Sequence, residues 1–556
     1  MTSPPERSPR HASPSSGSTW APLRVPIFRA LFAAQLGSNI GNWMETVGAQ
    51  WMLVHHPQAS TLVALVQTAD TLPFMFLALP AGVFADLFDR RRYLMFVHLF
   101  LTLTSGLMAV ATFAGVLGPP LLLALTFLEG AGTALAAPAW QAIIPELVPR
   151  SDLQAAAALG GINMNLARAV GPALAGVIVS RMGPGVVFAL NAVTFLFGIA
   201  VVFAWRPPPQ PATSLARERI VPAVRAGMRY VRHSPAARRL LLRLMLFVSP
   251  AVSLWALLPV VASDRLHLGP SGYGVLLGAL GVGALIAAVV LPSRRRRLSS
   301  GHMVAAASAL YAAALLVTGL VTNTAAVLVM LVGAGMAWLA ILVHVSASMQ
   351  LLLPAWVRAR GLAIYQLAFM GSQAIPAAIW GAIAQRWGIG PALVGAAIVL
   401  AGGAATIRRW PIYETSGLDR SAAIYWPMPT LLVDPDSTEG PVLVVIRYTV
   451  SHANSAAFVE AMARVGRSRQ RTGAVSWDLF RDGERPTQFV EVFLVSSWEE
   501  HHRQHEGRMT GADREFEQRA RALAAGPPEV THLFQAEASL RDEASRSAAI
   551  AQTDRA

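Results

Sequence analysis

Long apolar stretches recur along the first three quarters of the chain. The hydrocarbon core of a bilayer is about 30 Å thick, so a spanning helix needs about 20 mostly apolar residues. Twelve stretches of this kind can be traced. They run near residues 28–54, 62–85, 93–115, 119–143, 155–181, 185–205, 239–262, 273–292, 302–321, 325–350, 361–386 and 390–407. The pattern predicts an all-α polytopic membrane protein domain with twelve transmembrane helices.

After residue 440 the periodicity changes to short alternating segments. Alternation of apolar and polar positions predicts strands, and apolar positions three and four apart predict helices. Ser497-x-x-Glu500 has the form of a capping box, which predicts a helix from there to about Leu523. The other predicted elements are strands over 442–450, 474–481, 487–496 and 530–535 and a helix over 456–470. The order βαββαβ predicts a small α+β ferredoxin-like domain.

Arginines are concentrated in every second connection between the apolar stretches. Examples are Arg90, Arg91 and Arg92 after the second stretch and Arg294–Arg297 after the eighth. Cytoplasmic loops of membrane proteins carry an excess of positive charge. The alternation therefore predicts a multi-pass protein of the cell (inner, cytoplasmic) membrane with both termini in the cytoplasm.

The two halves of the membrane region repeat each other. Gln141-x-x-x-Pro145-x-x-Val148 recurs as Gln350-x-x-x-Pro354-x-x-Val357. The run Arg90–Arg92 likewise recurs near Arg294–Arg297. Two parallel six-helix halves joined by a long linker are typical of transporters. A twelve-span membrane enzyme is the alternative.

Domain boundaries follow from these patterns. Residues 1–22 are rich in Ser and Pro and lack the apolar core of a signal peptide. In the central linker, Ile220 to Val231 is basic and amphipathic, which predicts that it lies on the anionic leaflet. The predicted organisation is a disordered tail 1–22, an N-terminal half 23–205, a linker 206–238, a second half 239–410, a linker 411–439, a ferredoxin-like domain 440–540 and a tail 541–556.

Composition excludes several classes of function. Residues 1–410 hold 29 of the 45 basic and 10 of the 31 acidic residues, a net charge of +19, while residues 411–556 carry −5. The positive charge thus belongs to membrane loops, so no nucleic-acid partner is expected. The chain has no Cys, which excludes disulfides and thiolate metal sites. It also lacks a G-x-x-x-x-G-K-[ST] loop, which argues against direct drive by ATP. No cofactor is expected.

The connection after the second stretch reads Gly82-Val-Phe-Ala-Asp86-Leu-Phe-Asp89 and continues into Arg90–Arg92. Gly82 permits close helix approach, and Asp86 can pair with a cation or a helix N-terminus. A contact that opens and closes suits a conformational latch, and a static anchor of positive charge is the alternative. The segment resembles the signature loop of the major facilitator superfamily, with Leu87 and Asp89 replacing its usual Arg and Gly.

The fifth stretch contains Arg168-Ala-Val-Gly171-Pro172-Ala-Leu-Ala-Gly176. Glycines five residues apart beside a Pro bend a helix and allow tight packing. The segment resembles the Gly-Pro motif of superfamily antiporters and exporters. That resemblance implies export, and an importer of the same fold is the alternative.

Two further segments are similar to the subfamily that includes the enterobactin exporter. They are Pro138-Ala-Trp-Gln-Ala-Ile-Ile-Pro145-Glu-Leu-Val-Pro149 and Arg358-Ala-Arg360-Gly361-Leu-Ala-Ile-Tyr. The resemblance covers roughly residues 25–540. It implies proton-driven export of a small molecule, such as a siderophore, drug or secondary metabolite, by alternating access.

Ionisable residues inside a membrane are costly and mark functional sites. Glu45, Asp70, Glu129 and Arg168 lie within predicted spans, as does His344. We expect Asp70 or Glu45 to bind the coupling proton with Arg168 as the counter-charge. A static buried ion pair, or a residue that faces a water-filled cavity, is the alternative.

Uncharged polar residues in the spans are candidates for lining a substrate cavity. Bonding between helices is the alternative role for each of them. Trp43, Trp51 and Trp140 are candidates for contact with an aromatic substrate, and interfacial anchoring is their alternative. The amide candidates are Asn39, Asn42, Gln67, Asn163, Asn165, Gln366 and Gln373.

The C-terminal segments Arg471-Thr-Gly-Ala-Val-Ser-Trp477 and Ser497-Trp498-Glu-Glu-His501 resemble the antibiotic-biosynthesis-monooxygenase-like domain. That resemblance implies a dimeric α+β barrel, so a dimer through this domain is expected. His501 and His505 lie one helical turn apart, but without a third ligand no metal site is predicted. A membrane-anchored enzyme with monooxygenase-like activity in this domain is the rival function.

Overall fold

The computed structural model describes residues 20–206, 220–294, 300–407, 409–411 and 440–536. Predictions for residues 1–19, the linker 412–439, the tail 541–556 and Arg295–Arg297 lie outside the described residues. The chain divides into two compact units. The first comprises Met1–Thr213, Met245–Ile341 and Phe369–Ala405, and the second Ser214–Leu244, Leu342–Ala368 and Thr406–Ala556.

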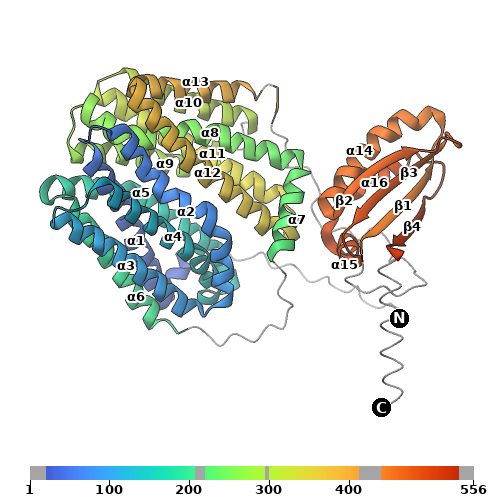
Figure 1. The fold of residues 1–556 in the computed structure, drawn as a ribbon, viewed down its shortest axis with the longest axis horizontal. Coiled ribbons are helices and arrows are strands. Elements are labelled where there is room, and N and C mark those ends of the chain that lie inside the picture. The colour runs from blue at the N-terminus through green and yellow to red at the C-terminus, as the bar shows by residue number, and fades with distance from the viewer. Residues whose placement is uncertain (1–19, 207–219, 295–299, 408, 412–439, 537–556) are drawn as a thin grey trace, which may run out of the picture. The chain divides into compact units, whose positions relative to one another are not determined.

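Six helices form the N-terminal part of the first unit (Figure 1). Proline stands in the first turn of α1, α4 and α6, where its missing N–H costs no hydrogen bond. Gly183 joins α5 to α6 with φ of 83°, a conformation that glycine adopts without strain. The helices are α1 (Pro26–Leu53), α2 (Ala59–Leu87), α3 (Arg90–Phe113), α4 (Pro119–Leu147), α5 (Leu153–Met182) and α6 (Pro184–Ala204).

The second half repeats this pattern. Gly388 joins α12 to α13 with φ of 93°, 205 residues after Gly183, so the sequence repeat is also a repeat of backbone conformation. A π-helical turn, Val261–Arg265, extends α8. The helices are α8 (Pro235–Val260), α9 (Pro270–Arg294), α10 (Ser300–Leu320), α11 (Thr324–Leu352), α12 (Ala355–Trp387) and α13 (Ile389–Ala405).

Each of the twelve predicted stretches coincides with one of these helices. Among the described residues, ten helices are long and apolar enough to cross a membrane. The two others are α1 and α13. The first is 28 residues long but carries polar residues such as Asn39, Asn42 and Glu45, whereas the second has only 17 residues. The predicted Ile220–Val231 segment is the helix α7 (Ile220–Arg232).

The C-terminal region forms a four-stranded antiparallel sheet of order β2-β3-β1-β4. The central strand β1 pairs with β3 through Val442↔Val495 and with β4 through Val442↔Phe534. Helices α14 and α16 lie against one face (Figure 1). The strands are β1 (Val442–Thr449), β2 (Ala474–Arg481), β3 (Gln488–Val495) and β4 (Glu529–Phe534), and the helices are α14 (Ser455–Thr472), α15 (Trp498–Arg503) and α16 (Gly511–Arg521).

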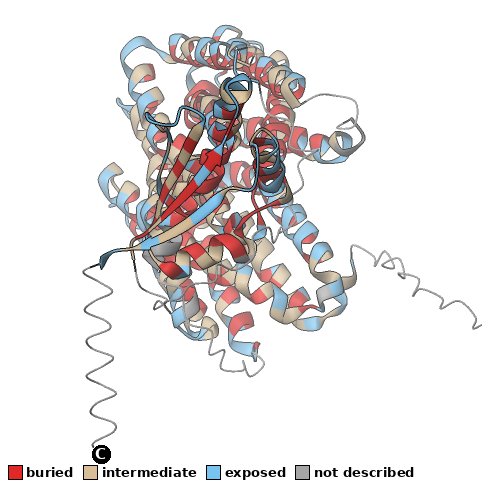
Figure 2. Cartoon of the chain, turned by 90° about the vertical axis from the view of Figure 1, so that its right-hand side faces the viewer, coloured by how far each residue is buried: buried red, intermediate tan, exposed pale blue. Residues whose placement is uncertain are grey.

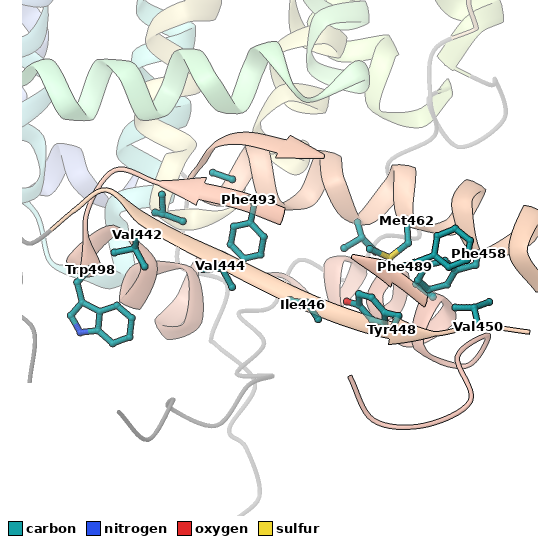
Figure 3. Close-up of a cluster of buried hydrophobic side chains, with 14 residues drawn as sticks. Val442, Val444, Ile446, Tyr448, Val450, Phe458, Met462, Phe489, Phe493 and Trp498 are labelled. Carbon is teal, nitrogen blue, oxygen red and sulfur yellow. The ribbon is translucent and has the colours of Figure 1, made fainter. Parts of the chain in front are cut away.

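The core of this region lies between the sheet and its helices. Val444, Ile446 and Tyr448 of β1 meet Phe458 and Met462 of α14 (Figure 3). Buried and partly buried residues alternate along β3, as its period-2 pattern predicts. Figure 2 shows buried residues, in red, along the strands of the sheet. The alternation assigns one face of the sheet to the core, and the core helices α14 and α16, among the described residues, lie on that face only.

The prediction of one helix from Ser497 to Leu523 is wrong. Ser497 does cap α15, accepting from the Glu500 N–H at 3.3 Å. The chain then makes a π-helical turn, Gln504–Arg508, where Gly507 has φ of 133°. Thr510 and Asp513 form a second, complete capping box that starts α16. The glycine and this second cap interrupt the helix.

Candidate functional site

A buried polar cluster lies where α1, α3, α4 and α6 meet. Glu45, Ser105, Glu129 and Asn191 belong to it, and each is at most 8% exposed. The Asn191 amide donates to Glu45 Oε2 at 2.6 Å, and the Ser105 hydroxyl donates to the same oxygen at 3.1 Å. Ser105 also contacts Glu129 Oε1, and Asn191 approaches that oxygen at 3.5 Å. Carboxyl groups from two helices therefore share the same two donors.

Elementary chemistry limits the charge that this cluster can hold. A hydroxyl group has one hydrogen to donate, so Ser105 cannot donate to both carboxylates at once. A proton on Glu45 or Glu129 supplies the missing hydrogen, because a protonated carboxyl group donates as well as accepts. Two buried carboxylates that contact the same donors would also repel each other if both were ionised. The arrangement can therefore hold one proton between two carboxyl groups.

Asp70 of α2 lies beside this cluster. The backbone of Asp70 packs against Gly130 of α4, where a Cβ would collide with the Asp70 carbonyl oxygen. The structure thus brings three of the four proton-coupling candidates together in one half of the bundle.

Arg168 of α5 is the fourth candidate, and it does not pair with the others. Its guanidinium Cζ lies 5.5 Å from the centroid of the Trp43 ring. Its Nε is buried and has no hydrogen-bond partner among the described residues. Arg168 is therefore not the counter-charge that was predicted for Asp70 or Glu45, because its guanidinium lies on an aromatic ring instead.

The amide candidates have different surroundings. Asn39 donates to Asn163 Oδ1 at 2.9 Å, and Asn163 donates to the Phe32 carbonyl at 3.1 Å, so these residues bond α1 to α5. Asn42 accepts from Asn191 at 3.4 Å at the edge of the carboxyl cluster. Asn165 donates to the Gly161 carbonyl in its own helix at 2.9 Å. Gln67 and Gln373 are partly exposed and Gln366 is exposed.

The remaining aromatic and histidine candidates are packed between helices. Trp51 stacks on Tyr273 of α9 with centroids 6.0 Å apart. Trp140 meets the edge of His98 at 5.9 Å. His344 is only 5% exposed.

The latch candidates lie at the α2–α3 connection. Asp89 caps α3, accepting from the Arg92 N–H at 2.8 Å, so this departure from the superfamily pattern has a structural role. Arg90 pairs with Glu146 of α4, and Arg91 donates to the Val202 carbonyl of α6 at 3.3 Å. Gly82 has open space at its Cβ position. The side chain of Asp86 lies outside the part that the structure describes.

The Gly-Pro motif lies where α5 meets α1 and α9. A Cβ on Gly171 would lie 2.6 Å from Cβ of Trp43, and one on Gly176 would lie 3.0 Å from Cα of Ser271. On the α9 side, a Cβ on Gly274 would lie 2.5 Å from the Pro172 carbonyl oxygen. The motif thus lets one helix of the first half touch the backbone of a helix of the second.

The C-terminal domain contains a histidine cluster that the sequence analysis recognised only in part. His501 Nε2 lies 3.2 Å from Nε2 of His505 and 3.1 Å from Nε2 of His532 on β4. Burial, with the neighbouring histidines, lowers the pKa of His501 to about 3, and burial beside Arg469 lowers that of His505 to about 4. Among the described residues no group of three or more His, Asp or Glu is arranged to hold a metal ion.

Glu500 joins the C-terminal domain to α7 within the second unit. It pairs with Arg229 of α7 at 3.0 Å and with Arg508 at 2.6 Å. Burial alone would raise the pKa of Glu500, but the two arginines lower it overall. Arg508 in turn lies 4.8 Å from the centroid of Trp356, whose Nε1 donates to the Arg508 carbonyl at 3.2 Å. The sequence predicts Glu500 as part of a helix cap, but its side chain makes these ion pairs instead.

Comparison with known proteins relates this arrangement to transport. A family model described as a transmembrane secretion effector matches residues 17–540. The chain is 23% identical over 260 residues to the staphyloferrin A transporter of Staphylococcus aureus. That alignment covers 46% of this chain and 64% of the transporter. It is 26% identical over 275 residues to the multidrug efflux pump Tap of Mycolicibacterium fortuitum, covering 48% and 66%. The alignments span less than two thirds of both relatives.

Solved structures share the fold. A bacterial homologue of the human lysosomal transporter Spinster, in an inward-facing and unoccupied conformation, aligns over 71% of this chain and 96% of its own, with a TM-score of 0.54 and 15% identity. A POT family transporter in complex with a thioalcohol-conjugated peptide aligns over 69% and 95%, with a TM-score of 0.56 and 13% identity.

Proposed function

Because the chain belongs to the transmembrane secretion effector family of major facilitator superfamily transporters, we propose that it exports a small molecule in exchange for protons. The single observation that carries the proton coupling is the pair Glu45 and Glu129, which share Ser105 and Asn191. A site that holds one proton between two carboxyl groups can load and release it as its access to water changes. Efflux proteins among the relatives support the direction of transport.

Alternating access requires contacts between the two halves that can break. Tyr273 donates to Gln50 Oε1 at 2.5 Å, and Thr68 donates to the Ala374 carbonyl at 2.7 Å. Gln385 donates to the Pro57 carbonyl at 3.1 Å. Each of these hydrogen bonds joins the two halves. Contacts of this kind can break and re-form as one half rocks against the other.

The finer features of the transporter are part of the same proposal. We infer twelve spans in the cell membrane, both termini in the cytoplasm, and membership of the enterobactin-exporter-like subfamily. We also infer that the segment from Gly82 to Arg92 is the latch and that the domain boundaries predicted above hold. The Arg90–Glu146 pair supports the latch, because it joins the loop to the end of α4.

Transport in membrane vesicles tests the proton coupling. We would impose a pH gradient and supply candidate substrates that include staphyloferrin A and a macrolide. Glu45→Gln and Glu129→Gln are expected to abolish accumulation driven by the gradient while retaining exchange of labelled for unlabelled substrate. The matched control is Asp152→Asn, since Asp152 lies in the loop before α5. Gradient-driven transport at the wild-type rate in both glutamine variants would contradict the proposal.

The C-terminal domain has a separate proposed role as a dimerisation unit resembling the monooxygenase-like barrels. On the face of the sheet opposite α14 and α16, Phe480 is 56% and Leu533 is 46% exposed. Val445, Val492 and Leu494 fall on that face by strand register. An apolar sheet face of this kind supports packing against a second copy of the chain.

The rival function is an enzyme in this domain. A hollow of about 10 Å³ borders Phe493, His501 and His505, which is about the space that one water needs. Incubating the full-length protein with haem, flavin or quinol separates the two functions. Turnover of any of them would favour the enzyme, and binding without turnover would favour the transporter alone.

A further inference from the structure

Arg168 is the one of the four proton-coupling candidates that does not lie in or beside the carboxyl cluster. Within the part of the chain that the structure describes, its Nε is buried without a hydrogen-bond partner, and its guanidinium contacts the face of Trp43. A charged group away from bulk water is costly unless it is paired. Arg168 and Trp43 are both partly exposed, so the pair is not closed off by the surrounding helices.

A row of aromatic rings continues from Trp43 into the second half of the bundle. Trp43 of α1 lies 5.7 Å from Trp255 of α8, and Trp255 lies 5.8 Å from Trp338 of α11. Phe369 of α12 follows at 6.3 Å from Trp338. The inner rings, Trp255 and Trp338, are at most 9% exposed, while Phe369 at the end is partly exposed. The row thus crosses from one half to the other.

We propose that Arg168 and this aromatic row form a subsite for a planar aromatic group that carries a negative charge. The guanidinium presents donors that match a carboxylate or phenolate. The partly exposed ring of Trp43 offers stacking surface to the ring that bears this anion. The inference rests on the proposed export function and names the class of its substrate as an aromatic anion.

Helix packing alone could account for the rings, and a cation–π contact alone could stabilise the arginine. Neither of these roles discriminates between a charged and an uncharged aromatic ligand. The subsite must prefer a charged ligand over a neutral one and an aromatic ligand over a saturated one. Arg168 accounts for the first preference and Trp43 for the second. Ligand pairs that differ in only one of these properties therefore separate the two explanations.

Calorimetric titration of the full-length protein in detergent is the test. Naphthalene-2-carboxylate, its neutral carboxamide and the saturated decahydronaphthalene carboxylate are compared without any pH gradient. We expect the aromatic carboxylate to bind about tenfold more tightly than the amide, equivalent to about 1.4 kcal/mol. We expect a similar preference over the saturated acid.

Variants assign these preferences to residues. Arg168→Gln is expected to remove the preference for the carboxylate over the amide, whereas Arg168→Lys, which keeps the charge, retains most of it. Trp43→Leu is expected to remove the preference for the aromatic ring. The matched control is Arg181→Gln, in the last turn of the same helix, with unchanged affinities.

Equal binding of carboxylate and amide to the wild type would overturn the subsite, as would an unchanged preference in Arg168→Gln. Lack of any binding at millimolar carboxylate would do the same. Because no gradient is applied, these results are independent of proton coupling. A failed coupling test with a retained anion preference would therefore reject only the proposed exchange with protons.

Discussion

At the scale of single residues, the chemistry of the bundle depends on two uncharged side chains. Ser105 and Asn191 are fully buried, and each contacts both carboxyl groups of the cluster. A hydrogen bond to a charged group contributes about 1.5–3 kcal/mol. They are therefore positioning residues, because they hold Glu45 and Glu129 close enough to share a proton.

Removing the shared hydroxyl tests this role. Ser105→Ala is expected to slow gradient-driven transport about tenfold, because one hydrogen bond to a charged group is lost. Exchange of labelled substrate in the absence of a gradient should change little, and the ratio of the two rates is the measurement. Ser180→Ala, which removes an exposed hydroxyl bonded within its own helix, is the control. Equal losses in both rates would indicate a general packing defect.

The histidine cluster makes the C-terminal domain sensitive to acid. Its histidines have an ordinary pKa of 6.5, but burial lowers the pKa of His501 to about 3 and that of His505 to about 4. Between these values the unfolded chain binds protons that the folded domain excludes. The contribution of these neutral histidines to the free energy of unfolding is therefore fully present above pH 6.5. It is lost as the pH falls toward 4.

Hydrogen exchange of the full-length protein measures this effect. Peptides that cover β4 and α15 should lose protection between pH 7 and pH 5, after correction for intrinsic exchange rates. His505→Leu, which cannot titrate, should lose less protection over the same range. A loss as large in the variant as in the wild type would remove His505 from the explanation.

Some residues of the candidate sites could be predicted from the sequence, and others could not. Intramembrane charge identified Glu45, Asp70 and Glu129, because such residues are conspicuous in apolar spans. Ser105 and Asn191 also lay within predicted spans, but a hydroxyl or an amide there has several ordinary roles. His532 sits alone on a strand, and nothing local to it indicates His501. Partners brought together from distant segments cannot be read from periodicity.

At the scale of elements, the repeat and the Gly-Pro motif determine how the halves meet. Helix ends were predictable to within a few residues, because apolar length and flanking Pro or Gly mark them. The break between α15 and α16 was missed, because the sequence pattern at Ser497 predicts one helix start, whereas a second start with a complete capping box lies at Thr510. The pairing of α5 with α9 was also beyond the sequence, since glycine spacing does not identify the partner helix.

The contact between α5 and α9 yields a prediction about packing. Gly176→Val would push a side chain into the backbone of α9, where Cα of Ser271 already lies 3.0 Å from the added Cβ. Overpacking of this kind costs about 1–3 kcal/mol. We expect a lower midpoint of thermal unfolding in detergent, measured by intrinsic fluorescence. Gly160→Val in the same helix has open space at its Cβ and serves as the control. Equal midpoints for the two variants would refute the close contact.

At the scale of the whole molecule, the proposed dimer can be tested on the full-length chain. Val492→Asp places a charge on the helix-free face of the sheet, which should convert a dimer into a monomer in light scattering after size exclusion. Val459→Asp is the control, because Val459 is 47% exposed on α14, on the other side of the sheet. A wild-type monomer would contradict the dimer.

The repeat has one further consequence. Asn191 stands eight residues after Gly183, and the residue eight after Gly388 is Ala396. Both residues are completely buried. Equivalent positions in the two halves therefore hold an amide in the first half and a methyl group in the second. Duplication preserved the scaffold while its two copies diverged in chemistry. A chimera built from two first halves would therefore carry two copies of the carboxyl cluster. One built from two second halves would lack this amide altogether.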